Sequence, residues 1–333
     1  MADAARGPVG AAGWRQRVLA AGAGLVAALG QAPFDFWPAT LVGLAIGFGL
    51  LSRAGTGRGA ALTGWAFGAG YFGLTFVWIV QPFLVDPEVH AWMAPFALVF
   101  MAAGLALFWG AAFALAHSIA PRGPLAPIAF AVGLGLAEWV RARIFSGLPW
   151  GGPGLAWIDT PVAQLASLVG AFGLSVLTAG LAAFGWHRTR SVGLMMRGSV
   201  ETLALLAAAW GLGALLHAGP VPERSEPQLI RLIQPNAPQH LKWDPDHTWV
   251  YYDRARALSA EPAEGSRPAR VVWPETAIAT LLGQYPEIEA DAAAAAAPGA
   301  LITGIRRLDG SRLFNSMVLF EADAATQVYD KHH

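Results

Sequence analysis

Apolar residues fill the first two-thirds of the chain in long runs that turn-forming residues interrupt. A helix rises about 1.5 Å per residue, so about 20 mostly apolar residues cross a hydrocarbon core of roughly 30 Å. We predict seven transmembrane helices, over residues 14–31, 36–52, 60–81, 91–117, 124–145, 161–186 and 199–218. The segments between them, rich in Pro, Gly and Arg, are predicted turns, because unpaired backbone is too costly inside lipid.

After residue 218 the pattern becomes that of a water-exposed α/β domain. Short β-type runs occur at 229–233, 270–273, 300–305 and 313–320, and helical spacing at 246–258 and 287–297. Strands that alternate with helices predict a layered α/β domain. A fifth strand is predicted to begin at 328–331, so we expect the sheet to be incomplete. The expected division is a transmembrane helical domain, 1–218, and a partial α/β domain, 219–333.

Arginine in the predicted turns sets the expected orientation. If seven spans alternate, most loop arginines share the side of the N-terminus, and only Arg141 and Arg143 lie opposite. This predicts a cytoplasmic N-terminus and places 219–333 on the outer side. Alternatively, the first span is a signal peptide cleaved near Ala32, and its removal would leave the later loops on the same sides.

Composition narrows the possible chemistry. The chain is 55% hydrophobic and 13% charged, whereas soluble domains are about a quarter charged. Net charge is zero and no basic block is present, which excludes an ordinary nucleic-acid binder. The absence of cysteine excludes disulfides, thiolate metal sites and a cysteine nucleophile within these residues. The histidines fit no ligand spacing, and adjacent His332 and His333 point to opposite faces of a strand, so we predict no metal.

Several short motifs occur in a fixed order along the chain. They are QAPFDFWP at 31–38, EWVR at 138–141, GLPW at 147–150, IQPNAPQ at 233–239, KW at 242–243, WPETA at 273–277, TG at 303–304, FNS at 314–316 and YDKHH at 329–333. Together, and after seven predicted spans, they resemble the bacterial apolipoprotein N-acyltransferases, membrane enzymes with a nitrilase-like domain. The resemblance covers almost all of this chain but only the front part of a family member.

The resemblance implies specific site residues. By motif, Glu275 and Lys331 match the family's catalytic Glu and Lys. The implied substrate-binding residues are Trp243, Asn315, Trp150 and Gly147. The family's cysteine has no counterpart, so we expect a chain truncated before that residue and catalytically inactive as given.

The resemblance also implies the reaction and its partners. A thiol, activated by Glu275, takes an acyl chain from a membrane phospholipid. Lys331 stabilises the negative charge that develops on the ester oxygen. The thioester then passes the chain to the N-terminal amine of a diacylated apolipoprotein. No cofactor is needed, and the implied location is the bacterial inner membrane with a periplasmic outer domain.

Each assignment has a non-catalytic alternative. Glu275 could cap a helix, Lys331 could be a solvated strand residue, and Asn315 could hydrogen-bond within a turn. Trp243 and Trp150 could be interfacial anchors.

Two other functions also remain open. A membrane-tethered nitrilase-like amidase would show the same Glu and Lys but would not need the motifs at 31–38 and 147–150. The seven predicted spans by themselves would also allow a transporter or a non-enzymatic membrane scaffold. Transporters usually show internal repeats and ionisable residues near the bilayer centre, and this sequence shows neither.

Overall fold

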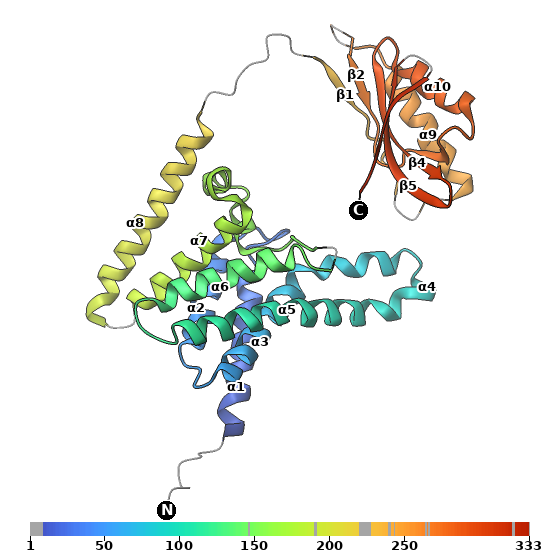
Figure 1. Ribbon diagram of the computed structural model, residues 1–333. Coiled ribbons are helices and arrows are strands. Elements are labelled where there is room, and N and C mark those ends of the chain that lie inside the picture. Colours follow the sequence, from blue (N-terminus) through green and yellow to red (C-terminus); the bar gives the residue numbers. More distant parts are fainter. Residues whose placement is uncertain are drawn as a thin grey trace, which may run out of the picture. The chain divides into compact units, whose positions relative to one another are not determined.

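The computed structural model describes residues 9–333 except 146, 190–191, 220–227, 239–240, 243, 264, 266, 322–323 and 333. The chain separates into two compact units, Met1–Pro220 and Val221–His333 (Figure 1). The first is helical and the second is built around a sheet. Each unit is described by itself below.

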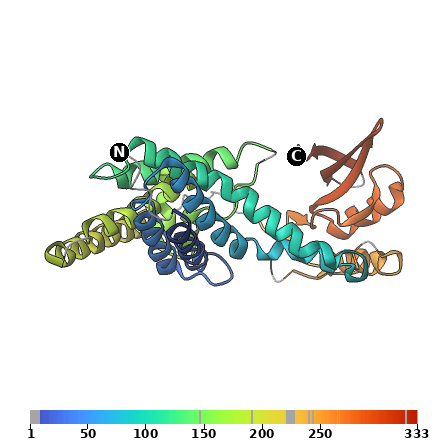
Figure 2. The ribbon, with the colours of Figure 1, turned by 90° about the horizontal axis from the view of Figure 1, so that it is seen from below.

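The helical unit consists of α-helices joined by short 3₁₀ segments. The α-helices are α1 (Val9–Ala28), α2 (Trp37–Leu51), α3 (Gly57–Thr75), α4 (Pro87–His90), α5 (Ala94–Ile119), α6 (Ala126–Arg141), α7 (Ala166–Arg188) and α8 (Val192–His217). The 3₁₀ segments are η1 (Val77–Leu84), η2 (Ala91–Met93), η3 (Pro153–Trp157) and η4 (Pro161–Leu165). Helix α8 lies at the periphery of this unit (Figures 1 and 2).

Three helical segments of the described chain are long and apolar enough to cross a membrane: Pro87–Ile119, Pro161–Arg188 and Met196–His217. Helix α3 with η1 makes a fourth if this pair, bent by 48°, is one span. The other predicted spans are realised as shorter or more polar helices. The 15 residues of α2 and the 16 of α6 rise only about 22 and 24 Å. The described helices therefore support three to four spans, and the count of seven stays a prediction.

Helices α3 and α5 pack closely because small residues line their contact. A Cβ added at Gly64 would lie only 2.6 Å from the carbonyl oxygen of Trp109. Without side chains in the way, the two backbones approach and van der Waals contact is maximised, as is usual between helices in lipid. Large rings fill the space beside the glycine, with Phe67, Tyr71 and Trp109 all completely buried. The ring centroids of Phe67 and Trp109 lie 5.4 Å apart.

The second unit contains a six-stranded mixed sheet with two helices. Its elements are β1 (Ile230–Leu232), α9 (Pro245–Ala260), β2 (Arg270–Val272), β3 (Ile278–Leu281), α10 (Pro286–Ala296), β4 (Ala300–Asp309), β5 (Arg312–Glu321) and β6 (Ala324–Asp330). The strand order is β1-β2-β4-β5-β6, with β3 paired to β4. Strands β1, β2, β3 and β4 are parallel where they pair, and β4, β5 and β6 are antiparallel.

Helices α9 and α10 pack on one face of this sheet (Figure 1). Alternate residues of β4 and β5 point into that core, among them Leu301, Ile305 and Val318, which are fully buried. The residues between them point to the opposite face, where Met317 is 52% exposed. The period-2 alternation of strands therefore separates a helix-covered face from an open face.

The structure confirms a mostly helical chain with candidate membrane spans and a small mixed sheet near the C-terminal end. One strand, β3, was not predicted. The fourth and fifth predicted strands are both longer than expected, since β5 begins at Arg312 and β6 at Ala324. Whether the sheet belongs to a larger nitrilase-like sandwich stays a prediction.

We expect Leu301→Ala to destabilise the sheet unit by about 2–5 kcal/mol, because it leaves a cavity beneath a fully buried side chain. The matched variant Leu313→Ala alters a side chain that is 57% exposed and should change stability by less than about 0.5 kcal/mol. Hydrogen–deuterium exchange of peptides from 270–330, measured in the full chain, reports both changes. Equal exchange in the two variants would contradict the core described here.

Candidate active site

The candidate site is built on the turn that follows β2. Trp273 fixes the end of this strand: its backbone N–H donates to the carbonyl of Ile302 at 2.8 Å, and its ring N–H donates to Ser259 Oγ at 2.7 Å. Pro274 follows and turns the chain, and its carbonyl accepts a hydrogen bond from Gly304 N at 3.2 Å. The next residue, Glu275, is thereby projected away from the core, with 62% of its side chain exposed.

This turn depends on a close approach of two backbones. A Cβ added at Gly304 on β4 would lie 2.6 Å from Glu275 Cα, a separation that Cβ atoms essentially never show. Thr276 is held in the left-handed region, with φ of +48°, which is unfavourable for a β-branched residue. A strained turn that packs against a glycine of the next strand is typical of a functional position.

Three chain segments meet at the carboxylate of Glu275. Lys331 Nζ lies 3.3 Å from Glu275 Oε1, and the amide nitrogen of Asn315 donates to the same oxygen. Asn315 lies on β5, and Lys331 directly follows β6. The backbone N–H of Lys331 donates to the carbonyl of Asn315 at 2.9 Å, so the antiparallel pairing itself sets these two side chains next to each other. Three of the residues expected from the motifs therefore converge.

A second lysine, whose role was not predicted, supports the same turn. Lys242 Nζ donates to the backbone carbonyl of Glu275 at 3.0 Å and contacts Thr276 Oγ1 at 3.3 Å. It lies on the loop between β1 and α9. The 333 residues contain only two lysines, and both contact this turn. The KW motif at 242–243 was the sequence feature that could have indicated this lysine, but the motif does not show which residue the lysine contacts.

The surrounding groups lower the pKa of Glu275. The largest cause is the hydrogen bond from Lys331, followed by the charge of that lysine and the hydrogen bond from Asn315; the charge of Lys242 adds to them. Partial burial opposes the shift. Glu275 is therefore ionised at neutral pH and can accept a proton. Because both side chains of the pair are more than half exposed, solvent screening keeps their net contribution to stability small.

Space for a ligand lies on both sides of Glu275. A cavity of about 320 Å³ on the open face of the sheet is lined by Ile302, Met317 and Tyr329 together with Asn315 and Lys331. A second cavity of about 170 Å³ lies on the other side of Glu275 and is more polar. The first cavity borders both the carboxylate of Glu275 and the ammonium group of Lys331, so a reacting carbonyl placed there would lie beside both groups.

Two other expected residues, Gly147 and Trp150, lie in the helical unit on a segment held by a buried arginine. Arg141 donates to the carbonyls of Leu148 at 2.5 Å and Trp150 at 2.8 Å. Gly147 has φ of +80°. The backbone of 147–150 thus turns back onto the end of α6. Whether Gly147 and Trp150 contact substrate stays a prediction.

The charge of Arg141 is compensated inside the same unit. Its Nη2 lies 2.5 Å from Glu138 Oε2, and both side chains are 1% exposed. Trp109 Nε1 donates to Glu138 Oε1 at 2.8 Å. Removing one member of a buried pair costs about 3–5 kcal/mol, so this ion pair fixes the segment as well as neutralising the charge. The ion pair is the arrangement expected from two charges one helical turn apart.

The remaining expected residue, Trp243, lies outside the described residues. Within the described ranges, no group of three or more His, Asp or Glu side chains is arranged to hold a metal ion.

Comparison with known proteins identifies the relatives of this chain. The family model for the apolipoprotein N-acyltransferase N-terminal domain matches residues 23–184. An apolipoprotein N-acyltransferase of Caulobacter vibrioides is 35% identical over 338 residues, which cover 96% of this chain and 63% of the relative. That of Rhodopseudomonas palustris is 32% identical over 361 residues, covering 99% of this chain and 66% of the relative.

The chain is a homologue of the apolipoprotein N-acyltransferases. This confirms the resemblance carried by the sequence motifs. A third apolipoprotein N-acyltransferase, from Brucella melitensis, is 35% identical over 293 residues, covering 83% of this chain and 54% of the relative. The chain thus spans between 54% and 66% of the length of these three relatives. The polar cluster around Arg141 lies inside the matched N-terminal domain, whereas Glu275 and Lys331 lie beyond it.

We expect Lys331→Met to raise the pKa of Glu275 towards its ordinary value, because it removes the largest cause of the downward shift. Lys331→Arg should keep the pKa low. Since the folded pKa is depressed, the stability that Glu275 contributes is present above its unfolded pKa and lost as pH falls through the folded pKa. Carboxyl-carbon NMR of the full chain with labelled glutamate, assigned through Glu275→Gln, measures the titration. Identical titrations in both variants would contradict the ion pair.

Proposed function

We propose that this chain contributes the general base and the oxyanion-stabilising cation of an apolipoprotein N-acyltransferase. The observation that supports this most strongly is the meeting of Glu275, Lys331 and Asn315 from three separate segments, in a homologue of that family. The acyl donor is a membrane phospholipid, and the acceptor is the N-terminal amine of a diacylated lipoprotein.

In the first step a thiol attacks the ester carbonyl of the phospholipid. The ionised Glu275 accepts the thiol proton, the sulfur–carbon bond forms, and the negative charge on the former carbonyl oxygen faces the ammonium of Lys331. When the ester C–O bond breaks, the lysophospholipid alkoxide takes the proton back from Glu275. The product is a thioester. The thiol is not among these 333 residues, which contain no cysteine.

In the second step the amine of the lipoprotein attacks the thioester. The nitrogen–carbon bond forms, the carbon–sulfur bond breaks, and Glu275 accepts the proton that the amine loses. That proton returns to the sulfur and regenerates the thiol. Asn315 keeps the carboxylate oriented by donating to the same oxygen as Lys331, so both steps use one fixed geometry.

Both substrates carry acyl chains that sit in the membrane, and the helical unit would hold the enzyme in the same membrane. Several of its helices are candidates to cross a membrane, and we place them in the bacterial inner membrane with the N-terminus cytoplasmic. Seven spans would deliver the sheet unit, as the first part of a nitrilase-like domain, to the periplasm. The arginines of the predicted loops support this orientation. A tethered amidase would not need the segment 147–150. Arg141 holds this segment through hydrogen bonds to the carbonyls of Leu148 and Trp150, which favours acyl transfer over the amidase alternative.

We expect the 333-residue chain by itself to be catalytically inactive, because no thiol is present to hold the acyl group between the two steps. Membranes that contain the chain, phospholipid and a diacylated lipoprotein peptide should yield no triacylated peptide and no hydroxylamine-labile acyl-protein. Either species would contradict the proposal and direct attention to another nucleophile, first Ser316, which lines the cavity beside Lys331.

We expect Glu275 and Lys331 to be essential once a family cysteine is supplied. The chain can be joined to the matching C-terminal segment of the Caulobacter vibrioides relative, which should give an active chimera. In it, Glu275→Gln and Lys331→Met should each lower the rate of triacylation by about 10²-fold or more, the usual effect of losing a general base or an oxyanion-stabilising group. Glu287→Gln, on the exposed surface of α10, is the matched control. Unaltered rates in the two site variants would remove both residues from the mechanism.

We expect two introduced cysteines to be labelled from opposite sides of the membrane. The chain has no cysteine of its own, so any labelling comes from the introduced residue. Ser311→Cys, in the β4–β5 turn, should react with an impermeant maleimide on intact spheroplasts. Gly55→Cys, in the α2–α3 loop, should react only after permeabilisation. The reverse pattern, or labelling of both sites before permeabilisation, would contradict the orientation.

A further inference from the structure

Helix α8 contacts the rest of the helical unit on both sides of a gap. Near the middle of the helix, Glu201 pairs with Arg188 of α7 at 2.7 and 2.9 Å. Towards the C-terminal end of the helix, Trp210 stands 5.8 Å from Trp37, ring centroid to ring centroid. Close packing there is enforced at Gly213, where an added Cβ would lie 2.5 Å from the carbonyl carbon of Pro161.

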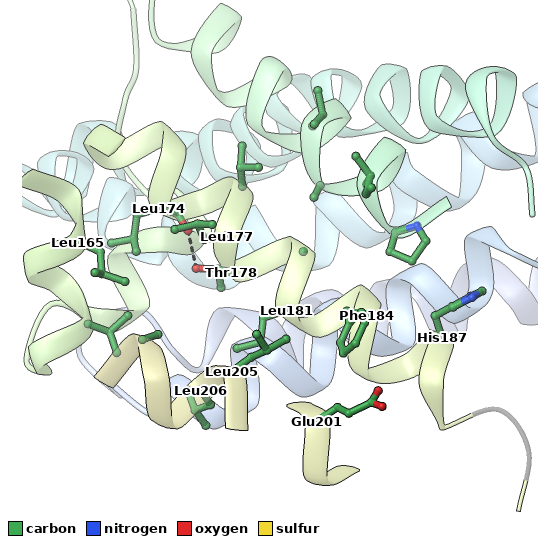
Figure 3. Close-up of a pocket in the computed structure, with 18 of the residues that line it drawn as sticks. Leu165, Leu174, Leu177, Thr178, Leu181, Phe184, His187, Glu201, Leu205 and Leu206 are labelled. Atoms are coloured by element: carbon green, nitrogen blue, oxygen red, sulfur yellow. Dashed lines mark hydrogen bonds between the residues drawn. The ribbon is translucent and has the colours of Figure 1, made fainter. Parts of the chain in front are cut away.

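The gap is a cavity of about 830 Å³ between α6, α7 and α8 (Figure 3). This lies within the range of roughly 300–1,000 Å³ that small-molecule sites occupy. From Leu174 to Arg188 its wall on α7 covers 14 residue steps, about 21 Å of helix. It is therefore long and narrow in the direction of the helix.

The middle of the cavity offers no polar group to a ligand. Leu177, Leu181 and Leu205 point into it (Figure 3). The one hydroxyl in this stretch, that of Thr178, donates to Leu174 O at 2.7 Å and accepts from Trp157 Nε1 at 2.8 Å. A ligand in this part must therefore be apolar.

One end of the cavity is polar instead. His187, Arg188 and Glu201 gather there, and Figure 3 shows His187 and Glu201 at the same end of the cavity. Among the described residues, the buried Nδ1 of His187 has no hydrogen-bond partner. Buried polar atoms normally have one, so the imidazole of His187 keeps an unused hydrogen-bonding position at this end of the cavity. Arg197 Nε also lies 3.1 Å from Glu201 Oε1. Two guanidinium groups, those of Arg188 and Arg197, therefore share one carboxylate at this end of the cavity.

We propose that this cavity binds a phospholipid, with one acyl chain between α6, α7 and α8 and the phosphate at the His187–Arg188 end. An amphiphile with a single anionic headgroup fits this cavity. Its acyl chain would match the length and apolar character of the middle, and its headgroup would match the basic end, where a histidine nitrogen lacks a hydrogen-bond partner among the described residues. Because α7 and α8 both belong to candidate membrane spans, lipid is the solvent around them. In the proposed orientation this lipid belongs to the cytoplasmic leaflet, so it is distinct from the acyl donor on the outer side.

The test uses the full chain, reconstituted with 1-palmitoyl-2-oleoyl phosphatidylglycerol and returned to mild detergent for native mass spectrometry. We expect the wild type to retain the lipid and Leu205→Trp, which fills the cavity, to reduce the retained fraction by about tenfold, equivalent to 1.4 kcal/mol. Leu203→Trp is the matched control, because Leu203 is on the same helix and 63% exposed but does not line the cavity. Ala209→Phe provides a second filling variant should the first fail to fold.

The headgroup is tested with 1-palmitoyl-2-oleoylglycerol, which has the same two acyl chains but no phosphate. Retention of the phosphatidylglycerol but not of this diacylglycerol supports the assignment of the polar end. Equal retention of both lipids, equal retention by the Leu205 and Leu203 variants, or a lipid-free dimer that places a second copy of the chain in the cavity would each overturn the proposal.

Discussion

The position of the Glu275 carboxylate depends on one close contact between backbones, where β4 passes the turn after β2. Gly304 makes the contact possible, since a Cβ there would stand 2.6 Å from Glu275 Cα. With the turn pressed against the strand, the carboxylate reaches the open face of the sheet. The antiparallel pairing of β4, β5 and β6 then brings Asn315 and Lys331 to the same place. The site is thus a consequence of sheet register, and its cation and its amide need no additional loop to position them.

The helical unit contains two buried charges, on Arg141 and Glu138, in an apolar environment. An isolated buried arginine would be prohibitively costly, but Arg141 has a carboxylate partner and two carbonyl acceptors. Those carbonyls belong to Leu148 and Trp150, so compensating the charge also fixes the segment that begins at Gly147. The homology of this unit extends through the same region, 23–184. The stability of the helical unit and the conformation of the segment 147–150 therefore depend on the same ion pair, Glu138–Arg141.

Periodicity predicted strands because it reports local requirements, and the alternation along 300–305 and 313–320 located β4 and β5. The family resemblance, and not the local pattern, implied that Glu275, Asn315 and Lys331 belong to one site. Hydropathy could not show where a helix bends or stops. The apolar run at 60–81 is broken at Phe76 by a 48° bend, and α6 ends at Arg141, whose side chain hydrogen-bonds the segment that follows. The contact of Lys242 with the Glu275 turn could not be predicted from local sequence either, because it joins residues 33 positions apart.

The central claim is that the carboxylate of Glu275 lies against Lys331 while Lys242 holds the backbone of the same turn. Zero-length carbodiimide cross-linking measures this directly, because the chain has only these two lysines. With Lys331 Nζ 3.3 Å from Glu275 Oε1, mass spectrometry of the membrane-embedded chain should find an isopeptide bond between Glu275 and Lys331, absent from Glu275→Gln. A bond from Glu275 to Lys242 alone, or none at Glu275 while other carboxylates react, would contradict the account.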